Sequence, residues 1–130
     1  MNGKYYDGIT GALVTNSYVR VGSDWYYVNS KGRRLKGAQI INNVAIYFNP
    51  QNGKQLKGGF DEDGYFYDKD SGAKTDLGKN HYVQINDAWY YIGSEGKILK
   101  GEQTIDGVQV HFDTITGVKL RGNLLLKMDD

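Results

Sequence analysis

Aromatic and polar residues alternate along this chain in a pattern that repeats with a period of about 21 residues, within the range typical of repeat architectures. In each unit, two adjacent large side chains precede a short polar turn that ends in glycine, and a further residue, leucine in most units, follows three positions after the glycine. These marker glycines are Gly11, Gly32, Gly53, Gly72, Gly96 and Gly117. Such a repeat determines the architecture more strongly than any single residue does.

Each unit predicts a strand, a tight turn and a second strand, because glycine supplies the positive φ that hairpin turns need. Further turn signals at Asn42-Asn43, Asp63-Gly64 and Asp106-Gly107 are predicted to separate one hairpin from the next. No segment keeps a 3.6-residue hydrophobic period. The sequence therefore predicts an all-β fold, a solenoid of about six β-hairpins with about 21 residues per repeat and essentially no helix.

We expect one repeat domain over residues 1–130. The predicted hairpins cover approximately residues 4–16, 24–38, 45–59, 64–77, 88–102 and 109–123. The tail 124–130 matches no repeat and is expected either to cap the last exposed edge or to be a simple terminus.

Two-residue alternation assigns the side chains to two faces. The aromatic residue five positions before each marker glycine is predicted to face the core, and Trp25 and Trp89 share its parity. These predicted core aromatics are Tyr6, Tyr27, Phe48, Tyr67, Tyr91 and Phe112. The residue one position earlier, such as Tyr47, is predicted to face outward together with the long polar side chains of the second strand.

A longer period is also present. The segments 18–28 and 82–92 match each other, and the offset between them also separates Trp25 from Trp89 and Gly53 from Gly117. The chain thus reads as two copies of a three-hairpin block. Because it starts within a hairpin at residues 3–14, it is expected to be a fragment of a longer array.

The charge of the chain excludes several partners. The formal net charge is +1 and there is no basic block, so neither a nucleic acid nor a membrane is predicted as a partner. The longest purely aliphatic run is Leu124–Leu126, which is too short to span a bilayer. With no cysteine the chain has no disulfide, and nothing in it predicts a cofactor.

Metal and catalytic motifs are incomplete. Residues 68–72 resemble the start of a calcium loop, but its twelfth position would be Lys79 rather than glutamate. His81 and His111 have no further ligand at zinc-binding spacing. The acidic pairs Asp61 with Asp63 and Glu95 with Glu102 fall in turns and connectors, whereas a glycosidase needs two carboxylates across one cleft. The sequence predicts no metal site and no enzyme.

The segments 36–58 ("KGAQIINNVAIYFNPQNGKQLKG") and 100–122 ("KGEQTIDGVQVHFDTITGVKLRG") resemble the cell-wall/glucan-binding repeats at the C-terminus of glucansucrases from lactic acid bacteria. The resemblance covers residues 4–122, and the same superfamily includes choline-binding modules and clostridial toxin repeats. It implies a non-catalytic module of a secreted, cell-surface-associated glucansucrase that binds a dextran-like α-glucan, with a catalytic domain as a partner in the full-length protein.

Choline is disfavoured by one departure from the pattern. Choline-binding repeats typically carry Gly-Trp after the second strand, where the tryptophan helps to form a cage for the quaternary ammonium. This chain has Gly37-Ala38, Gly58-Gly59, Gly101-Glu102 and Gly122-Asn123 at those positions. Attachment to choline or teichoic acid in the cell wall, and a spacer that binds no sugar, stay as alternatives.

Two sets of residues are candidates for sugar binding, since an aromatic ring suits the C–H face of a pyranose and long amides and amines suit its hydroxyls. The resemblance implies the same combination of tyrosine, glutamine and lysine. The first set is Gln39, Tyr47, Gln55 and Lys57, and the second is Gln103, His111, Lys119 and Arg121. The structural alternative is that these are ordinary cross-strand pairs, in which a ring lies under a lysine stem.

Overall fold

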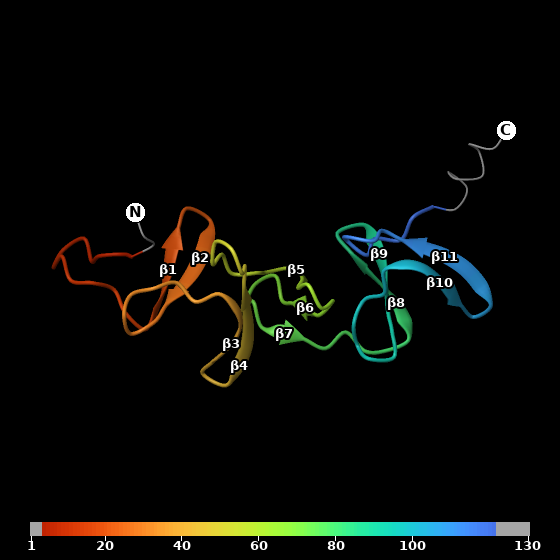
Figure 1. Ribbon diagram of the computed structural model, residues 1–130, viewed down its shortest axis with the longest axis horizontal. Coiled ribbons are helices and arrows are strands. Elements are labelled where there is room, and N and C mark those ends of the chain that lie inside the picture. Colours follow the sequence, from red (N-terminus) through yellow and green to blue (C-terminus); the bar gives the residue numbers. More distant parts are fainter. Residues whose placement is uncertain (1–3, 122–130) are drawn as a thin grey trace. The chain divides into compact units, whose positions relative to one another are not determined.

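The computed structural model describes residues 4–121, which contain strands, isolated bridges and turns but no helix (Figure 1). It follows that none of these residues belongs to a helix long and apolar enough to cross a membrane. The strands are β1 Ser17–Val21, β2 Asp24–Val28, β3 Gly37–Ile41, β4 Val44–Phe48, β5 Gly59–Phe60, β6 Phe66–Tyr67, β7 Lys74–Thr75, β8 His81–Ile85, β9 Ala88–Ile92, β10 Gly101–Ile105 and β11 Val108–Phe112. The predicted all-β class is confirmed.

The longest ladders are four antiparallel hairpins, β1–β2, β3–β4, β8–β9 and β10–β11. Two of their turns, at Asn42-Asn43 and Asp106-Gly107, lie where the sequence was expected to separate one hairpin from the next. Ile41 pairs with Val44 across Asn42 and Asn43, whose φ angles are 53° and 67°. Two consecutive residues with positive φ are typical of a type I′ turn, whose twist matches that of the flanking strands.

The marker glycines form a second kind of turn, which closes on a single bridge or a very short ladder. Phe48 is bridged to Gln55 and Phe112 to Lys119, while β6 pairs with β7 over two residues. The side chain at the start of the turn stabilises it: Asn49 Oδ1 accepts the N–H groups of Gln51 and Asn52 at 2.7 and 3.0 Å. The four long hairpins thus have tight two-residue turns, and most of the wider turns are organised by an Asn or Asp side chain.

In every unit after the first, the core contains the residue that directly precedes the wider turn. The predicted core positions of Phe48, Tyr67 and Phe112 are confirmed, because these side chains are 0%, 2% and 1% exposed. In the units marked by Gly32 and Gly96, however, Val28 and Ile92 take this place, at 0% and 1% exposure.

The prediction of Tyr27 and Tyr91 as core residues is therefore wrong, and the turn length explains why. Asn49 N–H bonds to Lys54 O, five residues on, whereas Asn29 N–H bonds to Arg33 O, only four residues on. A shift of one residue moves every side chain of a strand to the other face. Trp25 and Trp89 consequently leave the core as well, and Trp89 is 45% exposed.

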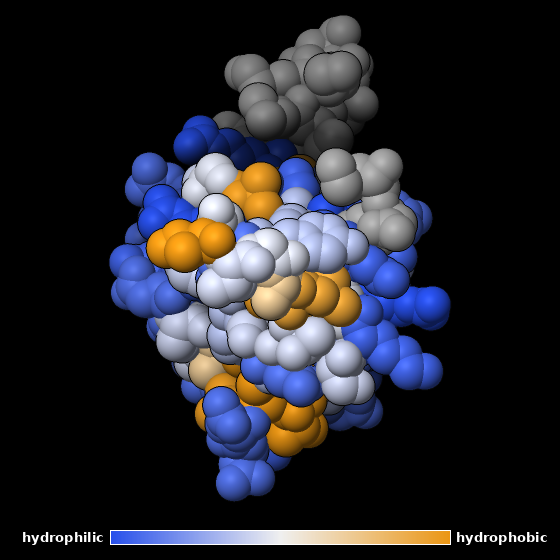
Figure 2. All heavy atoms as spheres, turned by 90° about the vertical axis from the view of Figure 1, so that its left-hand side faces the viewer, coloured by the Kyte–Doolittle hydropathy of each residue, from blue (hydrophilic) through white to orange (hydrophobic). Residues whose placement is uncertain are grey.

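Tyr6, also predicted in the core, is 61% exposed. It is bridged to Leu13 within the first wider turn, and Leu13 is itself 36% exposed. Figure 2 shows a face of the molecule on which apolar patches are separated by polar side chains.

The described residues form two compact units that are interleaved along the sequence. The first unit comprises the chain up to Asp61 together with Phe66–Thr75, and the second comprises Glu62–Tyr65 and the chain from Asp76 onward. In the second unit, Ile98 N–H bonds to Gly64 O at 3.0 Å, so the short segment Glu62–Tyr65 supports a residue far along the chain.

Within the first unit, polar and aromatic contacts join consecutive hairpins. The guanidinium of Arg34 lies 4.3 Å from the ring centroid of Tyr26, and its Nη2 donates to Tyr5 Oη at 2.7 Å. The buried Asp61 accepts the hydroxyl proton of Tyr67 at 2.9 Å. The Arg34–Tyr5 bond links neighbouring repeats, and the Asp61–Tyr67 bond ties β6 to the turn that follows β5.

Candidate functional site

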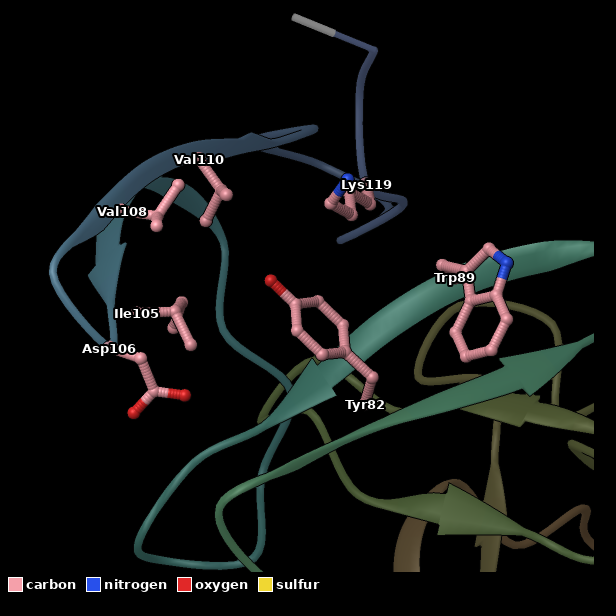
Figure 3. A pocket seen from close by; sticks show the side chains of 7 residues that line it. All are labelled: Tyr82, Trp89, Ile105, Asp106, Val108, Val110 and Lys119. Atoms are coloured by element: carbon pink, nitrogen blue, oxygen red, sulfur yellow. The ribbon is translucent and has the colours of Figure 1, made fainter.

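The second unit contains a hollow of about 680 Å³ between the hairpins β8–β9 and β10–β11 (Figure 3). Its lining residues are Tyr82, Trp89, Ile105, Asp106, Val108, Val110 and Lys119. The aliphatic side chains form one wall, the two aromatic rings form the other, and Asp106 and Lys119 lie at opposite ends. A volume of this order is typical of small-molecule sites, which combine apolar walls with a few polar groups.

The local sequence positions these groups on rigid elements. Tyr82 lies on β8, where it pairs with Tyr91 of β9, and its ring packs edge-on against Tyr91 at 4.9 Å and Trp89 at 6.5 Å between centroids. The N–H of Lys119 bonds to Trp89 O at 2.7 Å, which holds the lysine segment beside the indole. The aromatic wall is thereby fixed by neighbours on both sides.

Tyr82 presents a protonated hydroxyl to the hollow. Burial raises its pKa above the ordinary value of 10.0, and the neighbouring Tyr91 and Asp106 raise it further. Figure 3 shows the hydroxyl pointing into the space between the two walls. At neutral pH it can therefore both donate and accept a hydrogen bond.

The first unit repeats the aromatic part of this arrangement at the equivalent positions of the earlier block. Tyr18 on β1 and Trp25 on β2 pack edge-on at 6.3 Å, and Tyr18 packs against Tyr27 at 4.9 Å. Gln55 N–H bonds to Trp25 O at 2.7 Å, as Lys119 does to Trp89 O. Lys57 Nζ lies 5.1 Å from the centroid of the Trp25 ring.

The first predicted set of sugar-binding residues divides between two places. Gln55 and Lys57 lie beside Trp25, whereas the ring of Tyr47 packs against that of Tyr67 at 5.7 Å. The register pairs Gln55 with Phe48 rather than with Tyr47.

Gln39, the remaining member of that set, is turned toward its own backbone. It lies on β3 opposite Ile46, and its amide donates to Lys36 O at 2.8 Å. The expected common face of Tyr47, Gln55 and Lys57 is therefore not the arrangement in the structure.

The second predicted set divides in the same way. Lys119 lines the hollow, and Arg121 lies beside Trp89 and Lys119 at an adjoining depression of about 270 Å³. His111 instead pairs with Glu102 across β10–β11, with 3.5 Å between its Nε2 and a carboxylate oxygen, an ion pair when His111 is protonated.

Gln103, the last member of the second set, donates its amide to Lys100 O at 2.8 Å. This is the counterpart of the Gln39 bond to Lys36 O, also at 2.8 Å. In both units this glutamine, on β3 and on β10, thus stabilises the local chain.

Sequence reasoning missed the two aromatic pairs that the structure brings to these sites, Tyr18 with Trp25 and Tyr82 with Trp89. Their signal was present, since the two pairs occupy equivalent positions of the matching segments 18–28 and 82–92. The parity error at the shorter turns had assigned the tryptophans to the core. The described chain between residues 4 and 121 holds no group of three His, Cys, Asp or Glu side chains placed for a metal ion.

Comparison with known proteins agrees with this picture. The family model for the choline-binding repeat matches residues 19–60 and 35–76. Glucosyltransferase-I of Streptococcus downei is 36% identical over 126 residues, and Glucosyltransferase-S of Streptococcus mutans is 34% identical over 124 residues. These alignments cover 92% and 94% of this chain but only 8% of each relative.

Solved structures show the same fold. The modular autolysin LytC of Streptococcus pneumoniae superposes with a TM-score of 0.57 at 21% identity, covering 91% of this chain and 27% of that chain. Repeats of this kind resemble non-catalytic binding modules, so the chain is a carbohydrate- or cell-wall-binding module. Residues 19–76 match the choline-binding repeat, and most of the chain is similar to a short part of streptococcal glucosyltransferases.

Proposed function

We propose that this module binds a dextran-like α-glucan without catalysing a reaction, as an appendage of a secreted glucansucrase. The observation that carries the proposal is the hollow of the second unit, where Trp89 is 45% exposed and apolar walls meet polar ends. A pyranose has an apolar C–H face that suits the indole, and hydroxyl groups that suit Lys119, Asp106 and the Tyr82 hydroxyl. The glucosyltransferase relatives favour a glucan over other polysaccharides.

The proposed contact residues follow from this geometry. In the second unit they are Tyr82, Trp89, Lys119 and Arg121, and in the first unit Tyr18, Gln55 and Lys57, which lie beside Trp25. Gln39, Tyr47, Gln103 and His111 stay as predictions for contacts with sugars beyond these centres. Because the chain corresponds to 8% of the length of its relatives, the catalytic domain as a partner and the extracellular location are part of the proposal.

The test is electrophoretic retention in a gel that contains dextran, compared with a gel that lacks it. We expect Trp89→Ala to weaken retention by about tenfold in apparent Kd, which corresponds to about 1.4 kcal/mol of lost stacking and burial. Ile115→Ala is the matched control, because Ile115 is 80% exposed in the same unit but does not line the hollow. Equal retention of wild type and Trp89→Ala would refute the proposed site.

The same gel separates the alternatives. Binding of a neutral glucan should change little with salt, whereas an anionic wall polymer loses affinity as salt rises. We expect free choline to leave dextran retention unchanged, since only two of the seven lining residues are aromatic and they do not form a cage. Absence of retention in dextran together with elution by choline would support cell-wall attachment instead.

A further inference from the structure

The equivalent tryptophans Trp25 and Trp89 differ in their neighbouring cations and in their exposure to solvent. In the first unit, Lys57 Nζ and the Arg20 guanidinium carbon lie 5.1 and 5.9 Å from the centroid of the Trp25 ring. In the second unit, no cation from the described residues 4–121 lies over Trp89. Trp25 is half-buried, whereas Trp89 is 45% exposed.

Substitutions at equivalent positions account for the difference. At the offset that separates Trp25 from Trp89, Arg20 is replaced by Gln84 and Lys57 by Arg121. The ion pair between Lys54 Nζ and Asp24, at 3.3 Å, has Val118 and Ala88 in its place. The counterparts of Arg20, Lys54 and Asp24 around Trp89 are thus uncharged, whereas Arg121 keeps the positive charge of Lys57 and lies beside Trp89 rather than over its ring.

We propose that the two units recognise a saccharide by different chemistry, an inference that rests on the proposed function. In the second unit, Trp89 is the stacking platform and contacts the pyranose directly (Figure 3). In the first unit, Trp25 is a positioning residue: its ring holds the Lys57 ammonium, and that ammonium donates to sugar hydroxyls beside Gln55.

The physical reason is competition for the face of the ring. A cation over an indole is attracted by the negative face of the π system, and it excludes a sugar from that face. The same contact restricts the lysine side chain and so prepares its ammonium for hydrogen bonding. Hydrogen bonding discriminates among hydroxyl positions, whereas stacking tolerates changes in them. The first unit should therefore select linkage and configuration, and the second should add affinity for many pyranoses.

Tryptophan fluorescence tests the stacking half of the proposal in the full chain. In Trp25→Phe the remaining indole is Trp89, and we expect its emission to change saturably during titration with dextran. In Trp89→Phe the remaining indole is Trp25, whose emission should stay constant while the retained binding is weaker by about tenfold.

Two outcomes contradict the stacking part of the proposal, and a third refutes the proposed function. Equal responses from the two indoles, or a silent Trp89 in a variant that dextran still retains, would overturn the division of roles. Absence of dextran retention in the wild-type protein would instead refute the proposed function, and the inference with it.

The proposed positioning role of Trp25 is tested in the Trp89→Ala background, where dextran binding by the first unit is measured without the stacking contribution of Trp89. If Trp25 acts through Lys57, Trp25→Ala and Lys57→Met should weaken dextran binding by a similar factor, about tenfold, and the double substitution by no more than either. Trp25→Phe should recover part of the loss, since a phenyl ring still accepts a cation.

Lys54→Met is the matched control, because Lys54 pairs with Asp24 rather than with the ring, and we expect its affinity to be unchanged. Losses that multiply in the double variant would show that Trp25 contacts the sugar itself and would overturn the assignment. If Trp25→Ala does not fold, the comparison of Trp25→Phe with Lys57→Met and with their combination decides in the same way.

Discussion

Phe48 and Phe112 hold equivalent places in the two units, and both are almost completely removed from solvent. Each precedes a wider turn and is bridged across it, Phe48 to Gln55 and Phe112 to Lys119. Ile46, two residues before Phe48, is 3% exposed and is bridged to Ala73, so the next hairpin covers it. The core of each unit is therefore made by single residues at repeated positions, with few others to replace them.

Replacing Phe48 with alanine should lower the free energy of unfolding of the first unit by about 3–5 kcal/mol, the cost of a large cavity in a close-packed site. Urea denaturation followed by circular dichroism measures this loss. Ile40→Ala is the control in the same hairpin, because Ile40 is 70% exposed, and it should change stability by no more than about 0.5 kcal/mol. Similar effects of the two substitutions would contradict the assigned core.

At the scale of the element, the wider turns have aspartate or asparagine at one equivalent position, except the turn marked by Gly96, which has Gly93 there. Asp113 Oδ1 accepts the N–H groups of Ile115 and Thr116 at 2.8 Å each, just as Asn49 does for Gln51 and Asn52. Hydrogen bonds from the backbone, that of Thr116 first and then that of Ile115, hold the pKa of Asp113 below its ordinary value of 3.8. The backbone bonds of Ser71 and Asp70 lower the pKa of Asp68 in the same way.

The wider turns that contain aspartate should lose stability at acid pH. Because the pKa of Asp113 is lowered in the folded state, its stabilising contribution is complete above pH 3.8 and is lost as the pH falls through the lowered value. In an NMR titration, the amide shifts of Ile115 and Thr116 should move in this acid range. Those of Gln51 and Asn52 should not, since Asn49 does not titrate, and Asp113→Asn should remove the response. Equal movement in both turns would contradict the interpretation.

Sequence alone predicted the types of the elements, but not in every strand which side chains face the core. The marker glycines and the two-residue alternation correctly indicated an all-β repeat with Phe48, Tyr67 and Phe112 inside. They failed at Tyr27 and Tyr91, because a turn shorter by one residue contains the same glycine signal but reverses the parity of the strand.

Prediction of the candidate site depended on assigning each side chain to the correct face of its strand. Lys119 and Lys57 were identified from their chemistry, and the structure places each beside a tryptophan. Trp25 and Trp89 could not be recognised as surface rings while they were assigned to the core. The cations over Trp25 were also beyond sequence reasoning, since Arg20 and Lys57 belong to different hairpins and meet only through the stacking of those hairpins.

At the scale of the whole molecule, the division into two units does not follow the order of the sequence. Glu62–Tyr65 belongs to the second unit although Phe66–Thr75, which follows it, belongs to the first. Gly64 O accepts the N–H of Ile98, and a Cβ at Gly64 would lie 3.2 Å from atoms of Ile98, which is 6% exposed. The second unit is therefore incomplete without Glu62–Tyr65, a segment that lies in the sequence between two parts of the first unit.

Truncation tests this dependence. A fragment of residues 62–121 retains Gly64 and should keep the near-ultraviolet dichroism of the packed aromatic residues of the second unit. A fragment of residues 76–121 should lose much of that signal, because Ile98 then has neither its hydrogen-bond partner nor its cover. Equal spectra for the two fragments would show that Glu62–Tyr65 contributes nothing to the second unit.

Substitution in the full chain gives the same test without truncation. Gly64 and Gly107 have φ angles of 90° and 82°, so alanine is strained at both, by about 1–2 kcal/mol. Only at Gly64 would the new methyl group meet another residue, since nothing lies within 4 Å at Gly107. Gly64→Ala should therefore lower the urea midpoint of the second unit more than Gly107→Ala does.

The interleaving also bears on how such arrays lengthen in evolution. A gene duplication that copies one three-hairpin block reproduces the sequence motif, but its breakpoints need not coincide with a complete folding unit. A copy that lacks the counterpart of Glu62–Tyr65 depends on residues already present upstream for its own packing. Extension of an existing array keeps this packing, whereas a free-standing copy would lose it. Each added copy can change the cations beside its tryptophan while it keeps the backbone that supports them.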